Sequence, residues 1–313
     1  MPDVSLVIPF FNEEENLGEL IKQLNEYARS QTFSIEVVLV NDGSTDSSVD
    51  MIRGAVSAIP VKLVCLSKNF GSHAAIRAGL TQASGSYTMF FSADLQEPVS
   101  MIGQMYAKAC EGYDVVIARK ASVQTSVIER LFSGISTFLF GKIALMDYPK
   151  GGANNFLFIA KVRECICSNI ENNSSILMQI VNMGFKRAII DVSLAKRHKG
   201  KSKWTFWGKV KLFIDSFIAF SYAPIRAISI LGIVLFISGI LYAIWILIVS
   251  LTGYIEFNAG FPTLISVLLL GFGLTNFSIG IVAEYIWRTL DAARGRPVFI
   301  IDTVEMLSSG GDE

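Results

Sequence analysis

The stretch Phe90-Phe91-Ser92-Ala93-Asp94-Leu95-Gln96-Glu97-Pro98 runs from apolar residues into a lone carboxylate, with an amide two residues later. We interpret it as the end of a strand in an open α/β sheet, a class of sheet that binds ligands beyond the carboxyl ends of its strands. Hard divalent cations prefer oxygen ligands and substrate phosphates. The stretch therefore predicts a site for a metal and a diphosphate. The alternative is a helix N-cap, in which Asp94 or Ser92 only closes the turn before a helix at Pro98.

Short apolar runs alternate with helical patterns from residue 3 to about 120. The runs cover residues 4–9, 35–40, 61–66, 87–91 and 115–118. Between the first two, apolar residues recur at helical spacing, as at Leu17, Leu20, Ile21 and Leu24. Strands that alternate with helices build βαβ units, so we expect an α/β fold with a largely parallel, Rossmann-like sheet.

Polar residues gather where four of these runs end, at 12–15, 41–46, 67–71 and 92–97. Each cluster has a simpler interpretation: residues 42–46 could be only a turn and a helix cap, and the acidic residues 13–15 could complement a helix dipole. Four clusters at four successive strand ends favour a nucleotide-binding crevice along one edge of the sheet.

The hydrophobic content of 51% is high for a soluble enzyme, and the formal net charge is zero. Much of this excess lies in two uncharged blocks, 228–251 and roughly 261–283. Each is long enough to cross a hydrocarbon core of about 30 Å at about 1.5 Å per residue. Basic residues flank both blocks, so the positive-inside rule predicts a multi-pass protein with both termini in the cytoplasm.

A basic run at 196–203 precedes a segment whose apolar residues share one helical face. Such a helix would lie in the membrane interface with its lysines at anionic headgroups. We therefore expect a cytosolic α/β domain at 1–203, an amphipathic juxtamembrane helix at 204–226, a two-helix transmembrane hairpin at 227–286 and a cytosolic tail at 287–313.

Six stretches follow one another along the chain: Ile8-Pro-Phe-Phe-Asn-Glu-Glu-Glu-Asn16, Val40-Asn-Asp-Gly-Ser-Thr-Asp46, Ser67-Lys-Asn-Phe-Gly71, Ala93-Asp-Leu-Gln-Glu-Pro98, Arg197-x-x-Gly-x-Ser-Lys203 and Glu284-Tyr-Ile-x-Arg288. In these the chain resembles the membrane-attached polyprenyl-phosphate glycosyltransferases of inverting glycosyltransferase family 2, the group that includes dolichol-phosphate mannose synthases and bactoprenol glucosyltransferases. The likeness covers nearly the whole length.

The resemblance implies a GT-A-type fold and a hexosyltransferase that moves one sugar, with inversion, from a nucleotide-diphosphate sugar to polyprenyl phosphate. The reaction would take place on the cytosolic face of the plasma membrane, and the enzyme would be a homo-oligomer, a tetramer. The expected cofactor is Mg²⁺ or Mn²⁺. A UDP-sugar is our first expectation for the donor and a GDP-sugar the second, and the sugar itself is left open.

The resemblance also implies roles for individual residues. Those for the nucleotide sugar are Pro9, Phe11, Glu13, Asp42, Ser92 and Ala93. Those for the metal are Asp94 and Gln96. Those for phosphates are Arg119 and Arg130, with Arg197 and Lys203 for the acceptor phosphate. The expected catalytic set is Asp94, Arg119, Arg130 and Asn155.

Two positions depart from the family pattern. Ser92 stands where the family's aspartate-x-aspartate begins, and Asn155 stands where an aspartate is often found near the acceptor. A lipid monophosphate has a second pKa near about 6 and is largely dianionic at neutral pH, so it needs no general base to attack. The departures therefore bear more on the affinity for the metal than on the reactivity of the acceptor phosphate.

Two other functions remain as alternatives. A processive polysaccharide synthase would share the sheet but carry a Gln-x-x-Arg-Trp motif and more spans, and neither is present in the sequence. A non-catalytic membrane scaffold, a degenerate transferase, would have its support in Ser92 and Asn155.

Overall fold

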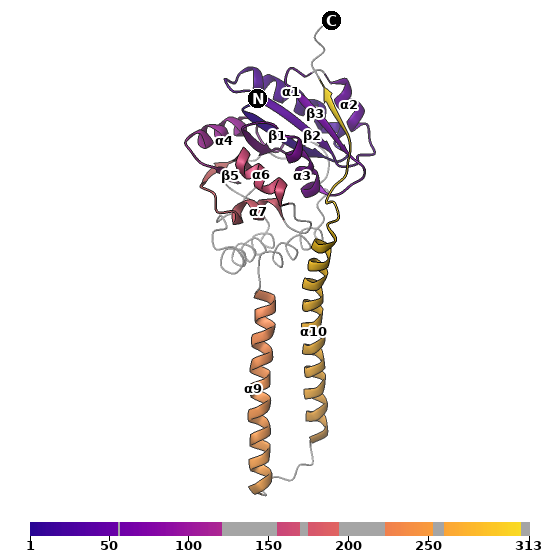
Figure 1. Cartoon of the computed structure of the whole chain (residues 1–313), viewed down its shortest axis with the longest axis vertical. Coiled ribbons are helices and arrows are strands. Elements are labelled where there is room, and N and C mark those ends of the chain that lie inside the picture. The colour runs from indigo at the N-terminus through magenta and orange to yellow at the C-terminus, as the bar shows by residue number, and fades with distance from the viewer. Residues whose placement is uncertain (56, 121–154, 170–174, 194–222, 253–259, 308–313) are drawn as a thin grey trace. The chain divides into compact units, whose positions relative to one another are not determined.

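The computed structural model describes residues 1–55, 57–120, 155–169, 175–193, 223–252 and 260–307 (Figure 1). The chain forms two compact units, Met1–Ser216 with Pro297–Glu313 and Phe217–Arg296. The predicted site residues Arg130, Arg197 and Lys203 lie outside the described residues, as does most of the predicted juxtamembrane helix.

The first unit is built on an eight-stranded sheet in the order β7-β5-β6-β4-β1-β2-β3-β8. Its strands are β1 (Val4–Phe10), β2 (Ile35–Asn41), β3 (Val61–Leu66), β4 (Tyr87–Phe90), β5 (Val115–Lys120), β6 (Asn155–Ile159), β7 (Arg187–Val192) and β8 (Ile301–Leu307). The five strands expected from the sequence are confirmed as β1 to β5, with ends that differ by at most about two residues.

The sheet is largely parallel, as expected. β1 pairs in parallel with β2 and with β4, and β2 pairs in parallel with β3. β6 runs antiparallel to its neighbours β4 and β5, and β8 runs antiparallel to β3. From β1 the chain proceeds to β2 and β3 on one side and returns to β4 on the other. The point between β1 and β4 is therefore a topological switch point, where open α/β sheets bind ligands.

Helices cover both faces of this sheet. α1 (Glu14–Arg29), α2 (Ser48–Gly54) and α4 (Ser100–Cys110) pack on one face, through residues such as Leu17, Ile52 and Met105. α3 (Ser72–Gln82), α6 (Ala160–Ser168) and α7 (Ile176–Asn182) lie together on the other (Figure 1). Every residue of β2 is buried, because both faces of this strand are covered. The predicted α/β class is confirmed.

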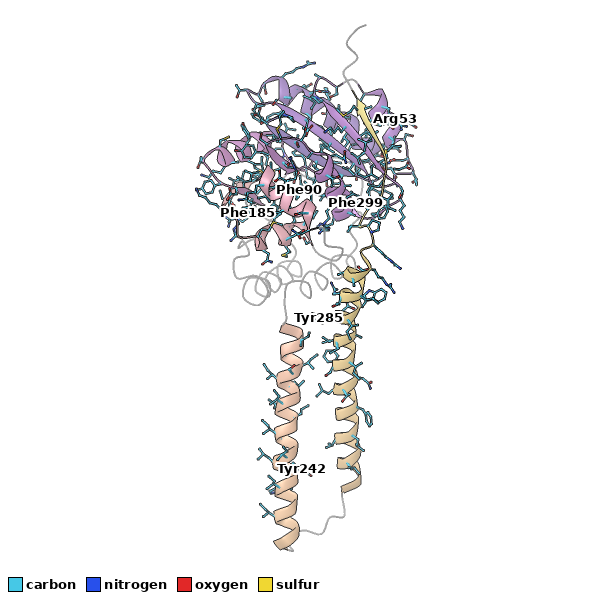
Figure 2. The ribbon with its side chains drawn as sticks, in the orientation of Figure 1. Arg53, Phe90, Phe185, Tyr242, Tyr285 and Phe299 are labelled. Atoms are coloured by element: carbon cyan, nitrogen blue, oxygen red, sulfur yellow. The ribbon has the colours of Figure 1, made fainter. Side chains whose placement is uncertain are left out.

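The C-terminal strand β8 was missed by the sequence analysis, which expected a separate tail. Instead, residues from Pro297 onward belong to the first unit. β8 carries Glu305, whose carboxylate accepts hydrogen bonds from the guanidinium of Arg53 at 2.6 and 3.0 Å. Arg53, which lies on α2, is labelled in Figure 2. The strand lies at the sheet edge and leaves four of its seven residues exposed, so its local pattern is weak. Only pairing with β3, far away in sequence, makes it a strand.

The second unit contains two long helices, α9 (Ala223–Thr252) and α10 (Gly260–Arg294). They include the blocks that the sequence analysis expected to cross a membrane. Within the described ranges, no helix combines the length and the apolarity that a membrane crossing requires. The predicted transmembrane hairpin is therefore not confirmed.

A buried carboxylate, Glu36, joins the strands near their amino ends. Ser5 Oγ and Ser84 N donate to Glu36 Oε1 at 2.5 and 2.6 Å, and Ser84 Oγ donates to Oε2 at 2.8 Å. Lys62 Nζ lies 3.6 Å from Oε2. Burial by itself would raise the pKa of Glu36, but these hydrogen bonds and the Lys62 charge outweigh it, so the pKa lies below its usual value.

We expect Glu36→Gln to destabilise the first unit by about 1–3 kcal/mol. The NH₂ group of the glutamine would replace one carboxylate oxygen, and the groups of Ser5 or Ser84 that donate to that oxygen would lose their acceptor. A carboxyl group with a lowered pKa in the folded state adds stability above its unfolded pKa, and this stability is lost as the pH falls through the folded pKa. The loss of stability on acidification below about pH 4.5 should therefore be smaller in Glu36→Gln than in the parent.

The measurement is the thermal midpoint of the full chain between pH 3 and pH 8. Glu26→Gln is the matched control, because Glu26 is exposed on α1 and undergoes the same chemical change. Equal midpoints for Glu36→Gln and Glu26→Gln at neutral pH would show that the Glu36 network contributes nothing.

Candidate active site

The predicted site residues that the structure describes lie at one edge of the sheet. Asp42 and Ser92 follow the carboxyl ends of β2 and β4, and Arg119 lies in the last residues of β5. Asn155 begins β6, which is antiparallel, and it pairs with Ala118 at the same edge. Topology therefore brings residues as distant in sequence as Asp42 and Asn155 to the same edge, the side where parallel sheets bind ligands.

The segment after β4 forms a tight turn around Asp94. Ser92 Oγ donates to Asp94 Oδ1 at 2.7 Å, and Gln96 N donates to the same oxygen at 3.2 Å. Leu95 has a φ of 59°, a left-handed conformation that is uncommon for a residue with a side chain. Such backbone strain clusters at functional sites. Neither Asp94 nor Ser92 is the N-cap of α4, because that position is Val99 and the helix has no side-chain cap. Both residues do close the turn, and the metal role of Asp94 stays a prediction.

Ala93 lies in this turn but packs its methyl group into the core, where it is 5% exposed. Any contact that it makes with a ligand would therefore come from its backbone. Ser92 keeps its hydroxyl at the surface of the turn and directs it to Asp94. The serine at the position of the family's first aspartate thus supports the remaining carboxylate with a hydrogen bond.

Glu97 is the residue of this site that the sequence analysis did not single out. Its Oε2 accepts the backbone N–H of Ser92 at 2.9 Å, and its Oε1 accepts the Asn155 side-chain amide at 2.9 Å. Burial raises the pKa of Glu97 to about 7, against the hydrogen bonds from Asn155 and Ser92, and the neighbouring Asp94 charge adds to the rise. An acidic residue five positions after a strand-end serine was the available signal.

The loops after β1 and β2 hold each other. Asn12 N donates to Ser44 Oγ at 2.9 Å, and Thr45 N donates to Asn12 Oδ1 at 2.8 Å. Glu13 N donates to Ser48 Oγ at 3.0 Å, and the Glu13 carboxylate accepts the Asn16 amide at 2.7 Å. Much of the polarity that predicted a nucleotide crevice is therefore used to build its walls.

Asp42 connects the second and third loops. The side chain is 4% exposed, and its two oxygens accept the backbone N–H groups of Phe70 and Gly71 at 2.7 and 2.9 Å. Burial raises the pKa of Asp42, and the two hydrogen bonds work against this rise. Gly43 permits the approach: it has a φ of 72°, and a Cβ there would lie 2.6 Å from the backbone of Asn69. Asp42 is thus placed to shape the loop.

The described arginine of the predicted phosphate set is engaged elsewhere. Arg119 Nε donates to Asp191 Oδ1 at 2.7 Å, and Nη2 donates to Oδ2 at 3.0 Å, across the β5–β7 pair. The exposed position of this pair means that it contributes little to stability. Pro9 and Phe11 lie at the end of β1, both partly buried. Their predicted contacts with a nucleotide, and that of Arg119 with phosphate, stay predictions.

A metal at this edge would depend on few protein ligands. In the part of the chain that the structure describes, no group of three or more His, Cys, Asp or Glu residues is arranged to hold an ion. Asp94 and Gln96 nevertheless offer hard oxygen donors in one turn. That donor set fits Mg²⁺ or Mn²⁺, which are commonly bound by one or two carboxylates and complete their shell with water and substrate phosphates.

Comparisons with known proteins give a consistent result. The family model described as Glycosyl transferase family 2 matches residues 5–150. An undecaprenyl-phosphate 4-deoxy-4-formamido-L-arabinose transferase of Photorhabdus laumondii is 31% identical, over 96% of this chain and 94% of its own. The protein of the same name from Proteus mirabilis is 32% identical, over 96% and 93%.

Solved structures with a similar chain path are more distant. Mannosyl-3-phosphoglycerate synthase from Rubrobacter xylanophilus is 13% identical with a TM-score of 0.49, over 68% of this chain and 71% of its own. TarS of S. aureus in complex with UDP-GlcNAc is 18% identical with a TM-score of 0.47, over 64% and 60%. No conclusion about function follows from similarities this low.

We expect Asp94→Asn to lower the affinity for Mn²⁺ in the presence of UDP by at least about tenfold. Asparagine can still accept the hydrogen bonds of the turn, so the change removes the charge and leaves the local structure in place. Electron paramagnetic resonance of free Mn²⁺ measures the affinity. Asp302→Asn on β8 is the control for loss of one exposed carboxylate. Equal affinity in parent and Asp94→Asn would remove Asp94 from the metal site.

Proposed function

Because the chain belongs to glycosyl transferase family 2, we propose that it transfers one sugar, with inversion, from a nucleotide-diphosphate sugar to polyprenyl phosphate. The observation that carries this proposal is the match, over nearly the whole of both chains, to relatives named as undecaprenyl-phosphate transferases. The strand-end turn around Asp94 at the switch point supports it, since this is where such a sheet would receive a diphosphate.

The reaction is one displacement. An oxygen of the acceptor phosphate forms a bond to the anomeric carbon of the sugar while the bond from that carbon to the donor diphosphate breaks. The nucleoside diphosphate leaves with the electron pair, and the configuration inverts. The acceptor phosphate is largely dianionic at neutral pH, so no residue has to remove a proton from it.

The protein has two tasks in such a reaction: to bring two polyanions together and to stabilise the leaving diphosphate. Asp94 and Gln96 would hold the divalent ion, with Ser92 directing its hydroxyl at Asp94 Oδ1. When bound, the ion neutralises charge on the diphosphate. Asp42 and Gly43 hold the loop after β3 in the shape that borders the same edge.

The donor base and the sugar are finer questions. A UDP-sugar remains the first expectation and a GDP-sugar the second. Sugar selectivity depends on a few hydrogen bonds in the pocket. The predicted homo-oligomer and the acceptor role of Arg197 and Lys203 also stay predictions.

We expect the purified full chain, given Mn²⁺ and polyprenyl phosphate, to convert one member of a panel of UDP- and GDP-sugars into a glycolipid. Its mass should exceed that of the acceptor by a single sugar residue, and nuclear magnetic resonance should show the inverted anomeric configuration. Asp94→Asn should reduce turnover by more than about 100-fold.

Polyprenol without its phosphate serves as the negative acceptor in this assay. Products that carry several sugar residues would instead support the processive synthase. If no donor is bound or consumed by the folded protein, the scaffold interpretation holds and the proposed transferase function is wrong.

We also propose that α9 and α10 attach the enzyme to the plasma membrane, where its lipid acceptor resides. Large apolar side chains are exposed around α9, among them Leu231, Leu235, Ile237, Ile240 and Leu241. A helix that is apolar on all sides needs an apolar environment. Lipid provides that environment and brings the active site to a membrane-bound acceptor.

We expect the full chain to float with membranes and to resist extraction by high salt. Ile237→Lys combined with Leu241→Lys should release much of it, because each lysine costs about 2.5–3.5 kcal/mol near the centre of an apolar helix in lipid. Glu26→Lys with Asp302→Lys, at exposed positions in the first unit, controls for added positive charge. A parent chain that stays in the supernatant without detergent would contradict this attachment.

A further inference from the structure

A chain of three hydrogen bonds links the turn after β4 to the start of β6. Ser92 N donates to Glu97 Oε2 at 2.9 Å. Asn155 Nδ2 donates to Glu97 Oε1 at 2.9 Å. Phe156 N donates to Asn155 Oδ1 at 2.6 Å. Asn155 and Phe156 are 2% and 0% exposed, so the hydrogen bond between them is shielded from water. Water could otherwise supply a missing partner.

The hydrogen-bond series begins and ends at a backbone N–H group, of Ser92 and of Phe156, and a backbone N–H can only donate. The two side chains between them must therefore offer an acceptor to each end and share one donor in the middle. A carboxylate with an amide meets this requirement. Two amides would place donor against donor, and two carboxylates would place like charges in contact unless they shared a proton.

The Phe156 N–H also fixes the orientation of the amide. If the Asn155 side chain flipped, its NH₂ group would face the Phe156 N–H, and its oxygen would face the Glu97 carboxylate. The pattern of one acceptor at each end and one donor between them can be met in two ways. Either position can carry the carboxylate, provided that the other carries the amide. Glutamate at 97 with asparagine at 155 is one of two equivalent arrangements.

We propose that Glu97 and Asn155 act as one positioning pair, in which a single carboxylate and a single amide hold the Asp94 turn against β6. The proposal rests on the proposed transferase function for its effect on turnover. The pair contacts Ser92, whose hydroxyl donates to Asp94, so it acts on the metal-binding carboxylate through the turn.

This inference gives Asn155 a new interpretation. An aspartate there would not restore a missing base, because it would face the carboxylate of Glu97 at hydrogen-bond distance. Asn155 instead complements Glu97 through its side-chain amide, and the backbone N–H of Ser92 donates to the other oxygen of Glu97.

The test is an exchange of the two groups in the full chain. Asn155→Asp alone and Glu97→Gln alone should each lower kcat by about 10- to 100-fold and raise the Mn²⁺ concentration for half-activation, as loss of a partner that orients a metal ligand does. The KM for the acceptor should change less than kcat. The double variant Asn155→Asp with Glu97→Gln restores the hydrogen-bond pattern, and we expect kcat and the Mn²⁺ requirement to return to within about threefold of the parent.

Asn155→Asp with Glu26→Gln is the matched control, since it has the same two chemical changes but leaves Glu97 in place, and it should not recover. A double exchange no better than the worse single variant would overturn the proposal, as would parental kinetics in both single variants. A pair that only supports folding would change the thermal midpoint and leave the Mn²⁺ requirement of the folded enzyme unaltered.

Thermal midpoints keep the test decisive if the single variants fold poorly. The exchanged chain should then still melt close to the parent, and its failure to fold would overturn the pairing. If the parent transfers no sugar to any acceptor, the proposed function fails by itself. The pattern of lowered midpoints in the single variants, restored in the exchange, together with Mn²⁺ affinity, then still tests the pair.

Discussion

Parallel pairing of β1 with both β2 and β4 is the constraint on which the rest of the first unit depends. Parallel neighbours cannot be joined by a tight turn, so each connection has to cross a face of the sheet as a helix. The helices then bury both faces, and the loops that leave the parallel strands β1 to β4 begin at one edge of the sheet. The connection after β1 leads to β2 on one side, and the strands β5 to β7 that follow β4 lie on the other side. The loops after β1 and β4 therefore separate at this point and leave room for a ligand.

The loops at this edge show how a site is built from polar residues without many of them being free for a ligand. Asn12 and Glu13 are tied to the loop after β2, and Asp42 holds the loop after β3. A buried polar group is costly unless it is hydrogen-bonded, so these contacts are what allows irregular backbone to lie beside the core. Polar clusters at strand ends therefore predict where a site would lie, but several of their side chains are used in contacts between the loops.

Glu97 changes the meaning of the two departures from the family pattern. Considered singly, Ser92 and Asn155 suggest a weakened enzyme. In the structure, the Ser92 hydroxyl supports Asp94, and both residues donate to Glu97. The turn therefore carries a connected set of hydrogen bonds in place of a second aspartate. In the proposed reaction, a network of this kind would fix the position of Asp94, the carboxylate that we predict to hold the metal.

The sequence by itself determined where the first five strands lie along the chain and the α/β class, and it predicted a site at one edge of the sheet, because burial on both faces leaves continuous apolar runs that end in polar turns. It also determined the family, through six motifs in a fixed order. Only the tertiary structure decided that the last strand joins β3, that Arg119 pairs with Asp191, and that Glu97 meets Asn155, which lies 58 residues away. Hydrogen-bond partners that are far apart in sequence meet only because the topology of the sheet places them side by side, so a local sequence pattern cannot predict them.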